Sequence, residues 1–124
     1  MKTSHILYAT DKNYLEITLA SILSLLENAQ LEEPILHLIT EKLEDEDYQK
    51  IEKVMHAYPQ IKYYIYPLED YHIEKYHIPE WKGSQVANSR LFFQEILAKQ
   101  LSEIDNLLYL DSDTIVVDQL NTLF

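Results

Sequence analysis

Short apolar runs alternate with longer segments of helical spacing along the first half of the chain. Apolar, β-prone runs occupy residues 5–9, 35–39 and 61–66. Between them, residues 15–27 and 41–58 carry apolar side chains three and four positions apart, which is the spacing of one helix face. This β-α-β-α-β order predicts the α/β class, with a mostly parallel sheet, right-handed crossovers and flanking helices.

The boundaries of both predicted helices are marked by particular residues. Asn28 is the expected end of the first helix and Pro34 a break after it, while acidic residues 44–47 suit the first turn of the second helix. Pro59 ends that second helix. The inward side chains are expected to be Leu15, Leu19, Ile22, Leu23 and Leu26 in the first helix, and Tyr48, Ile51, Met55 and Tyr58 in the second.

The second half of the chain begins with a long segment that has no periodicity. Pro67, Pro79 and the single glycine, Gly83, mark residues 67–83 as a loop, and residues 84–100 have the spacing of a third helix. The apolar run that follows predicts a last strand buried on both faces, ending at two aspartates.

Those two aspartates, Asp111 and Asp113, are the strongest chemical signal in the sequence. In an extended chain they point to the same side, and two adjacent carboxylates favour a bound cation or a shared proton. Hard cations such as Mg²⁺ and Mn²⁺ suit this pair and keep coordination positions for phosphate oxygens. In a parallel α/β sheet, Asp11 and Asn13 after the first strand lie at the same ligand-binding edge.

Composition excludes several other classes of protein. The net charge of −11 disfavours a general nucleic-acid or anionic-membrane binder, and one glycine cannot build a glycine-rich phosphate loop. With 124 residues, 47% of them hydrophobic, we expect one folded domain spanning 1–124. No run is long enough to span a bilayer, the apolar run in residues 1–10 is too short for a signal peptide, and there are no cysteines, so we expect a cytoplasmic protein.

Three blocks in order resemble the N-terminal part of a glycosyltransferase of family eight, the retaining class with a Rossmann-like GT-A nucleotide-diphospho-sugar transferase fold. The first is Ile6-Leu-Tyr-Ala-Thr-Asp-Lys-Asn-Tyr14, the second is Ser89-Arg-Leu91, and the third is the Asp-x-Asp block in residues 108–117, with Leu120, Leu123 and Phe124 after it. The resemblance implies metal-dependent transfer of a hexosyl group from a UDP-sugar.

The resemblance also implies a role for each matching residue. Asp11 would accept a hydrogen bond from the uracil ring, Tyr14 would stack on it, and Asn13 would be a nearby polar contact. Asp111 and Asp113 would bind Mn²⁺ or Mg²⁺. The implied substrate-binding set is Ala9, Thr10, Asp11, Asn13, Tyr14, Arg90 and Ser112, in which Ser112 lends its backbone to the ribose and Arg90, the only arginine, meets the sugar or diphosphate.

Two departures from the family pattern shape what we expect of activity. The family has a third metal ligand, a histidine, and its acceptor-site residues further downstream, whereas all five histidines here precede Asp111. Asn88 also stands where an aromatic residue is frequent. We therefore expect the donor-binding portion of a longer enzyme, with catalytic residues that the sequence does not identify.

Other interpretations of the same residues stay open at this point. Asp11 and Asn13 suit a helix cap, Tyr14 suits core packing, and Arg90 suits a surface ion pair. The aspartate pair also fits a phosphatase-type nucleophile and acid, or a solvated turn at a strand end. A non-catalytic nucleotide-sugar-binding module that self-associates through uncovered apolar surface, as a homo-oligomer, is the alternative of a different class.

Overall fold

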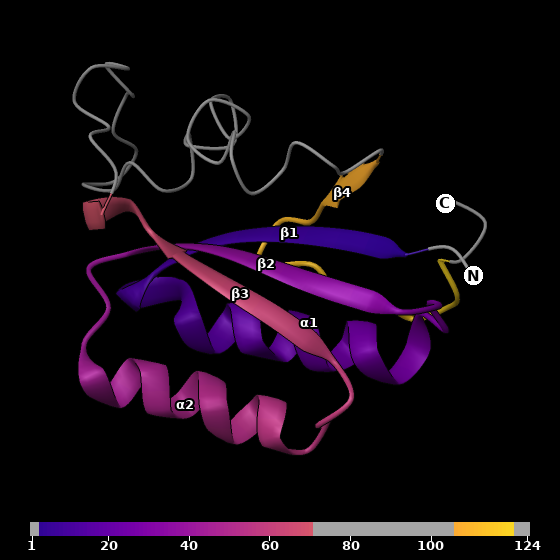
Figure 1. Cartoon of the computed structure of the whole chain (residues 1–124), viewed down its shortest axis with the longest axis horizontal. Helices are drawn as coiled ribbons and strands as arrows, with labels where there is room; N and C mark the ends of the chain where they lie inside the picture. Colours follow the sequence, from indigo (N-terminus) through magenta and orange to yellow (C-terminus); the bar gives the residue numbers. More distant parts are fainter. Residues whose placement is uncertain (1–2, 71–105, 121–124) are drawn as a thin grey trace.

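The computed structural model describes residues 3–70 and 106–120 as a parallel sheet with two helices. Figure 1 shows both helices on the same side of the sheet. In chain order the elements are β1 (Ser4–Asp11), a 3₁₀ turn η1 (Lys12–Tyr14), α1 (Leu15–Asn28), β2 (Pro34–Glu41), α2 (Asp45–His56), β3 (Lys62–Pro67), a 3₁₀ turn η2 (Leu68–Asp70) and β4 (Leu107–Tyr109).

The described strands lie in the order β3-β2-β1-β4, and every neighbouring pair is parallel. The β1–β2 register runs from Ser4 opposite Pro34 to Asp11 opposite Glu41. β4 adds to the other side of β1, with His5 opposite Leu107. The strand order therefore reverses between β1 and β4, and the carboxyl ends of strands at such a reversal are where open α/β sheets bind ligands.

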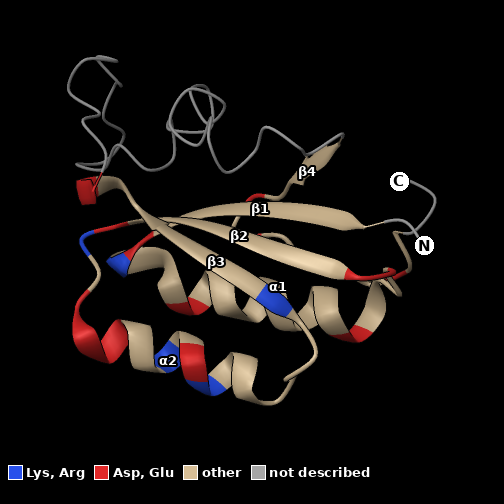
Figure 2. Ribbon diagram, in the orientation of Figure 1, with Lys and Arg blue, Asp and Glu red and all other residues tan. Residues whose placement is uncertain are grey.

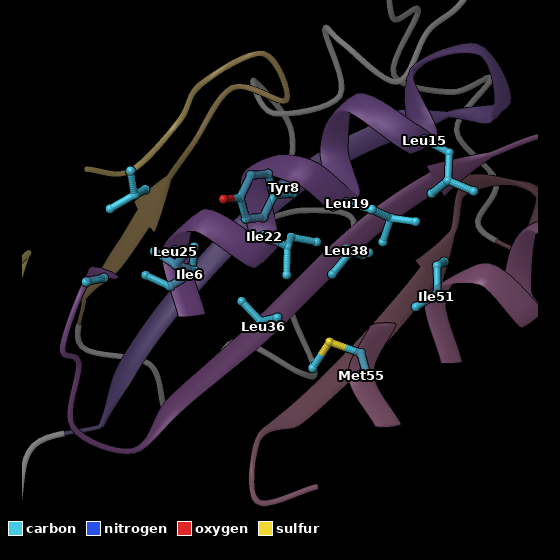
Figure 3. Close-up of a cluster of buried hydrophobic side chains, with 12 residues drawn as sticks. Ile6, Tyr8, Leu15, Leu19, Ile22, Leu25, Leu36, Leu38, Ile51 and Met55 are labelled. Carbon is cyan, nitrogen blue, oxygen red and sulfur yellow. The ribbon is translucent and has the colours of Figure 1, made fainter. Parts of the chain in front are cut away.

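The core lies between the sheet and the two helices. Figure 3 shows side chains from β1 and β2 directed at α1 and at Ile51 and Met55 of α2. Even-numbered positions of both strands face the helices because side chains alternate along a strand. The fully buried members of this cluster are Ile6, Tyr8, Leu15, Ile22, Leu25, Leu36, Leu38 and Ile51.

The order of strands and helices is confirmed as far as the described residues extend, and the end of α1 at Asn28 is confirmed. The predicted inward position of Leu23 is wrong, because that side chain is 38% exposed. The helix instead buries Leu25 and two small polar residues, Thr18 and Ser21. These small side chains let the helix approach the sheet more closely than a continuous leucine face would allow.

Helix α2 is shorter than predicted at both ends. It begins at Asp45 because Thr40 and Glu41 extend β2, and because the Asp47 carboxylate accepts a hydrogen bond of 2.9 Å from the Glu44 backbone N–H. It ends at His56 rather than residue 58. The break predicted at Pro34 is confirmed, since α1 has ended at Asn28 and this proline is the first residue of β2.

The last strand differs from its prediction in two ways. β4 is half-buried rather than buried on both faces, and it is an edge strand of the described sheet. The β-prone residues after the aspartates form no strand in the described part of the chain. The predicted third helix, most of the 67–83 loop, Asn88 and Arg90 lie outside the described residues.

A buried polar network occupies the sheet face opposite the helices. His5 Nδ1 lies 3.0 Å from His37 Nε2, and His37 Nδ1 lies 2.8 Å from the Tyr66 hydroxyl. The three residues come from β1, β2 and β3, and the His37 ring is stacked against His5, Tyr64 and Tyr66. Burial, together with the charge repulsion of the nearby His5, lowers the pKa of His37 to about 4.

Thr40 carries the one buried side-chain polar atom without a hydrogen-bond partner in the described part of the chain. We expect Thr40→Val to raise the free energy of unfolding by about 1 kcal/mol, because it removes an unsatisfied hydroxyl at nearly constant volume. Thr10, its neighbour in the β1–β2 register, is the matched control, since its hydroxyl donates to Asp11 O at 3.0 Å. Thr10→Val should lower stability, and urea unfolding that shifts in the same direction for both variants would contradict this account.

Candidate functional site at the carboxyl ends of β1 and β4

Asp11 is the last residue of β1 and caps the turn that follows it. Its Oδ1 accepts a hydrogen bond of 3.1 Å from the Tyr14 backbone N–H, and Tyr14 O in turn accepts one of 2.9 Å from the Thr18 hydroxyl. The capping interpretation of Asp11 is therefore confirmed. The side chain is only 7% exposed, so its position is set by the sheet as well as by the cap.

The two aspartates after β4 lie on a tight turn and not on an extended strand. Thr114 N donates to Asp111 O at 3.2 Å, and the Thr114 hydroxyl donates to the same oxygen at 2.7 Å. Asp111 and Asp113 are therefore not aligned by alternation along a strand, and that prediction is wrong. The physical reason is that the amide and the hydroxyl of Thr114 both donate to Asp111 O, and these two bonds hold the backbone in a turn instead of an extended strand. Both aspartates are exposed.

Two hydrogen bonds fix this turn to β1. Leu110 N donates to Leu7 O at 3.0 Å, which continues the ladder beyond β4. The Ser112 hydroxyl then donates to Ala9 O at 3.0 Å. Ala9 and Ser112, which the sequence assigns to the same substrate, are thereby brought into contact, and the aspartate turn lies beside the strand that ends in Asp11.

The segment after the turn is held along α1 by the backbone of Val116. The Ser24 hydroxyl accepts from Val116 N at 2.8 Å, and Asn28 Nδ2 donates to Val116 O at 2.8 Å. Further on, Leu120 N donates to Ala29 O at 2.9 Å. The buried Val116 side chain joins the core cluster, so the helix and the site share one packed unit.

The remaining predicted site residues are placed as follows. Asn13 is exposed in η1 and Tyr14 is half-buried at its end, beside Asp11. Thr10 is buried, and alternation along β1 places it on the helix-facing side, away from Ala9 and Asp11. Arg90 lies outside the described residues.

Sequence reasoning missed Glu41. It lies opposite Asp11 in the β1–β2 register, is only 7% exposed, and has its Oε2 3.9 Å from Lys42 Nζ. The apolar spacing places Glu41 at the start of the second helix, whereas the structure makes it the last residue of β2, paired with Asp11 of β1. A second carboxylate therefore stands beside Asp11 at the same edge.

Basic groups are few around this edge. Figure 2 shows the acidic first turn of α2 and a single lysine in η1. That lysine, Lys12, pairs with Glu44 at 2.7 Å, and the hydrogen bond with Glu44 raises the pKa of Lys12. Lys42, which follows Glu41 at the end of β2, has its Nζ 3.9 Å from the Glu41 carboxylate, so both lysines that the structure describes at this edge lie beside a carboxylate. A bound cation would favour the approach of an anionic ligand to such an edge.

The donor set of the turn fits a hard divalent cation. Asp111 and Asp113 offer exposed carboxylate oxygens, which Mg²⁺ and Mn²⁺ prefer. Within the described residues there is no group of three or more histidine, cysteine or acidic side chains that could hold a metal ion. From residues 3–70 and 106–120 a cation at this pair would therefore take at most two side-chain ligands, which leaves positions for diphosphate oxygens and water.

A parallel sheet with a paired-aspartate turn at its switch point defines an α/β protein whose ligand-binding edge carries carboxylates. The chain belongs to glycosyl transferase family 8, whose family model matches residues 5–124. It is 30% identical over 127 residues to the probable galacturonosyltransferase-like 2 of Arabidopsis thaliana, covering 99% of this chain and 36% of that protein. Family membership favours glycosyl transfer over the phosphatase interpretation of the aspartate pair.

Solved glycosyltransferase structures share the fold. The apo structure of the bifunctional glycosyltransferase WbbM matches 98% of this chain and 20% of its own, with a TM-score of 0.73 and 18% identity. The galactosyltransferase LgtC, in complex with donor and acceptor sugar analogues, matches 96% of this chain and 41% of its own, with a TM-score of 0.67 and 21% identity. The GT-A-like fold is therefore confirmed, and the chain spans less than half the length of these relatives.

The described part of the chain contains no helix that is both long enough and apolar enough to cross a membrane.

Proposed function

We propose that this chain forms the donor-binding side of a retaining, metal-dependent glycosyltransferase that uses a UDP-sugar. The observation that carries the proposal is the hydrogen bond from Ser112 to Ala9 O, which fixes the aspartate turn beside the end of β1. A nucleotide bound along β1 would then extend its diphosphate toward Asp111 and Asp113. Family membership and the topological switch point support the same assignment.

Each described side chain has a distinct part in this proposal. Asp11 accepts from the uracil ring with the carboxylate oxygen that the Tyr14 amide leaves available, and Tyr14 stacks on the base. Asn13 and Ala9 line the nucleoside site, and the Ser112 backbone meets the ribose. Thr10 contributes through its hydrogen bond to Asp11 O rather than by direct contact. Arg90 stays a proposed contact of the sugar or diphosphate.

Asp111 and Asp113 are the proposed ligands of Mn²⁺ or Mg²⁺. When bound, such a cation neutralises the diphosphate leaving group and lowers the barrier to breaking the sugar–phosphate bond. The chain's own contribution is to hold the two carboxylates on a turn whose backbone is fixed at Asp111 O and Ser112. The net charge of −11 disfavours diphosphate binding unless a cation or a local arginine intervenes, and the proposed cation supplies that positive charge.

Asp11→Asn separates ligand contact from capping. The asparagine side-chain oxygen can still accept from Tyr14 N, so we expect stability to change by less than about 0.5 kcal/mol. Affinity for UDP with Mn²⁺ should fall about tenfold, because a charged acceptor is lost. Calorimetric titration of UDP, with thermal unfolding of the same samples, measures both. If the binding free energy and the unfolding free energy of Asp11→Asn fall by the same amount, Asp11 acts only as a cap.

The self-associating, non-catalytic module remains a second candidate because of one observation. Ile115 is 61% exposed and Val117 is 82% exposed, on a segment that is otherwise held against α1. Apolar side chains this exposed favour contact with another surface.

A cytoplasmic location stays part of the proposal, since a chain without cysteines suits a reducing compartment.

A further inference from the structure

Three hydroxyl groups from three separate segments connect the protein core to the aspartate turn. Tyr8 on β1 has its hydroxyl 2.9 Å from Ser21 Oγ on α1. Ser21 Oγ lies 3.2 Å from Thr114 Oγ1, and Thr114 Oγ1 lies 2.7 Å from Asp111 O. Tyr8 and Ser21 are fully buried and Thr114 is half-buried. Figure 3 shows the Tyr8 ring among the core side chains beside α1.

The chemistry of the last bond fixes the direction of the whole chain. A backbone carbonyl only accepts, so the Thr114 hydroxyl must donate its one hydrogen to Asp111 O. Ser21 must then donate to Thr114, and Tyr8 must donate to Ser21. Burial raises the pKa of Tyr8 to about 12, with the Ser21 hydrogen bond acting in the opposite direction, so Tyr8 keeps the proton that it donates.

We propose that Tyr8, Ser21 and Thr114 are positioning residues that hold the Asp111 backbone in its metal-binding arrangement. The proposal rests on the function proposed above. Asp111 O accepts from both the amide and the hydroxyl of Thr114, so one carbonyl closes the turn and joins it to the core. A turn fixed in advance loses less conformational freedom when it binds a cation, which increases affinity without adding a ligand.

A general role in packing the segment along α1 is distinguishable from this one. Ser24, one turn further along α1, accepts from Val116 N at 2.8 Å and donates its own hydrogen to the backbone Ser21 O at 2.6 Å. Ser21 and Ser24 thus anchor the same segment with the same functional group at two different places. Only the Ser21 hydroxyl continues to Asp111, so Ser21→Ala and Ser24→Ala form a matched pair.

The test uses the full chain and two measurements. Hydrogen exchange at the Thr114 amide reports whether the turn is closed, and calorimetry reports UDP affinity with and without Mn²⁺. We expect Thr114→Val to speed exchange at residue 114 and to weaken Mn²⁺-dependent UDP binding, each by about fivefold. Thr114→Ser should stay within about twofold of the unmodified protein, since the hydroxyl remains. Ser21→Ala should weaken binding more than Ser24→Ala does.

The outcomes separate this proposal from the proposed function. Equal weakening of binding by Ser21→Ala and Ser24→Ala would overturn the positioning role. So would a Thr114→Ser variant that binds as weakly as Thr114→Val. If the unmodified protein binds no UDP with Mn²⁺, the proposed function fails, and exchange at residue 114 still decides whether the hydroxyl chain closes the turn. In that case, unchanged exchange of the residue 114 amide in both Thr114→Val and Ser21→Ala would overturn the positioning role. Thermal unfolding of every variant confirms that it is folded.

Discussion

Lowering the pH from 6.5 toward 4 should cost this protein about 2–3 kcal/mol of stability through His37 alone. Burial lowers the pKa of His37 to about 4, below the ordinary value of 6.5. Above pH 6.5 the side chain is neutral in both states and contributes no pH dependence. Below 6.5 the unfolded chain binds a proton that the folded protein does not bind, so unfolding becomes more favourable until the folded protein is protonated near pH 4.

The measurement is the slope of the unfolding free energy against pH, from urea melts between pH 5 and 6.5. His37→Gln should remove up to about 1.4 kcal/mol per pH unit of that slope, the value for one proton. His56→Gln is the matched control, because it removes a histidine from the exposed surface of α2. A slope that is unchanged by His37→Gln, or reduced equally by both substitutions, would contradict the assignment to His37.

The geometry explains why His37 resists protonation. In the neutral ring one nitrogen donates and the other accepts, and both are already used by His5 and the Tyr66 hydroxyl. A second proton on His37 requires His5 Nδ1 to accept, and it brings a positive charge close to His5 in a buried site. The network therefore stabilises the folded protein while His37 is neutral. That stabilisation is lost in acid, when the buried His37 ring becomes protonated.

Much of the fold follows from local patterns in the sequence. The alternation of β-prone runs with helical spacing gave the correct order of β1, α1, β2, α2 and β3. The errors occur at boundaries, where short-range signals compete. Glu41 lies in a strand because β2 pairs with β1 through Asp11, and the Asp47 cap delays α2 to Asp45. Neither the pairing nor the cap can be seen in the apolar spacing alone.

The residues of the candidate site could be predicted from the sequence, but the backbone geometry that positions them could not. Asp11 and the aspartate pair follow strands, which is visible in the sequence. The turn at Asp111 depends on Ser21 and Ala9, which are 93 residues from Thr114 and 103 residues from Ser112. The histidine network is equally distant in sequence, with His37 32 residues from His5 and 29 from Tyr66. Such contacts exist only once the sheet has formed.

Removing either carboxylate of the aspartate turn should abolish most of the metal-dependent binding. We expect Asp111→Asn and Asp113→Asn each to weaken binding of UDP with Mn²⁺ by about 100-fold, since even residues behind the ligands of a metal site typically contribute 10- to 100-fold. Asp118→Asn is the control, because it removes the same charge from an exposed aspartate whose carboxylate accepts a hydrogen bond from the neighbouring Gln119 N. It should leave the affinity unchanged.

The titration of UDP into the full chain, first with Mn²⁺ and then with a chelator, tests the central claim most directly. We expect heat from one site with Mn²⁺, its loss on chelation, and its loss in Asp111→Asn but not in Asp118→Asn. Heat that is independent of Mn²⁺, or that is the same in Asp111→Asn as in the unmodified protein, would contradict a metal-held diphosphate at this turn.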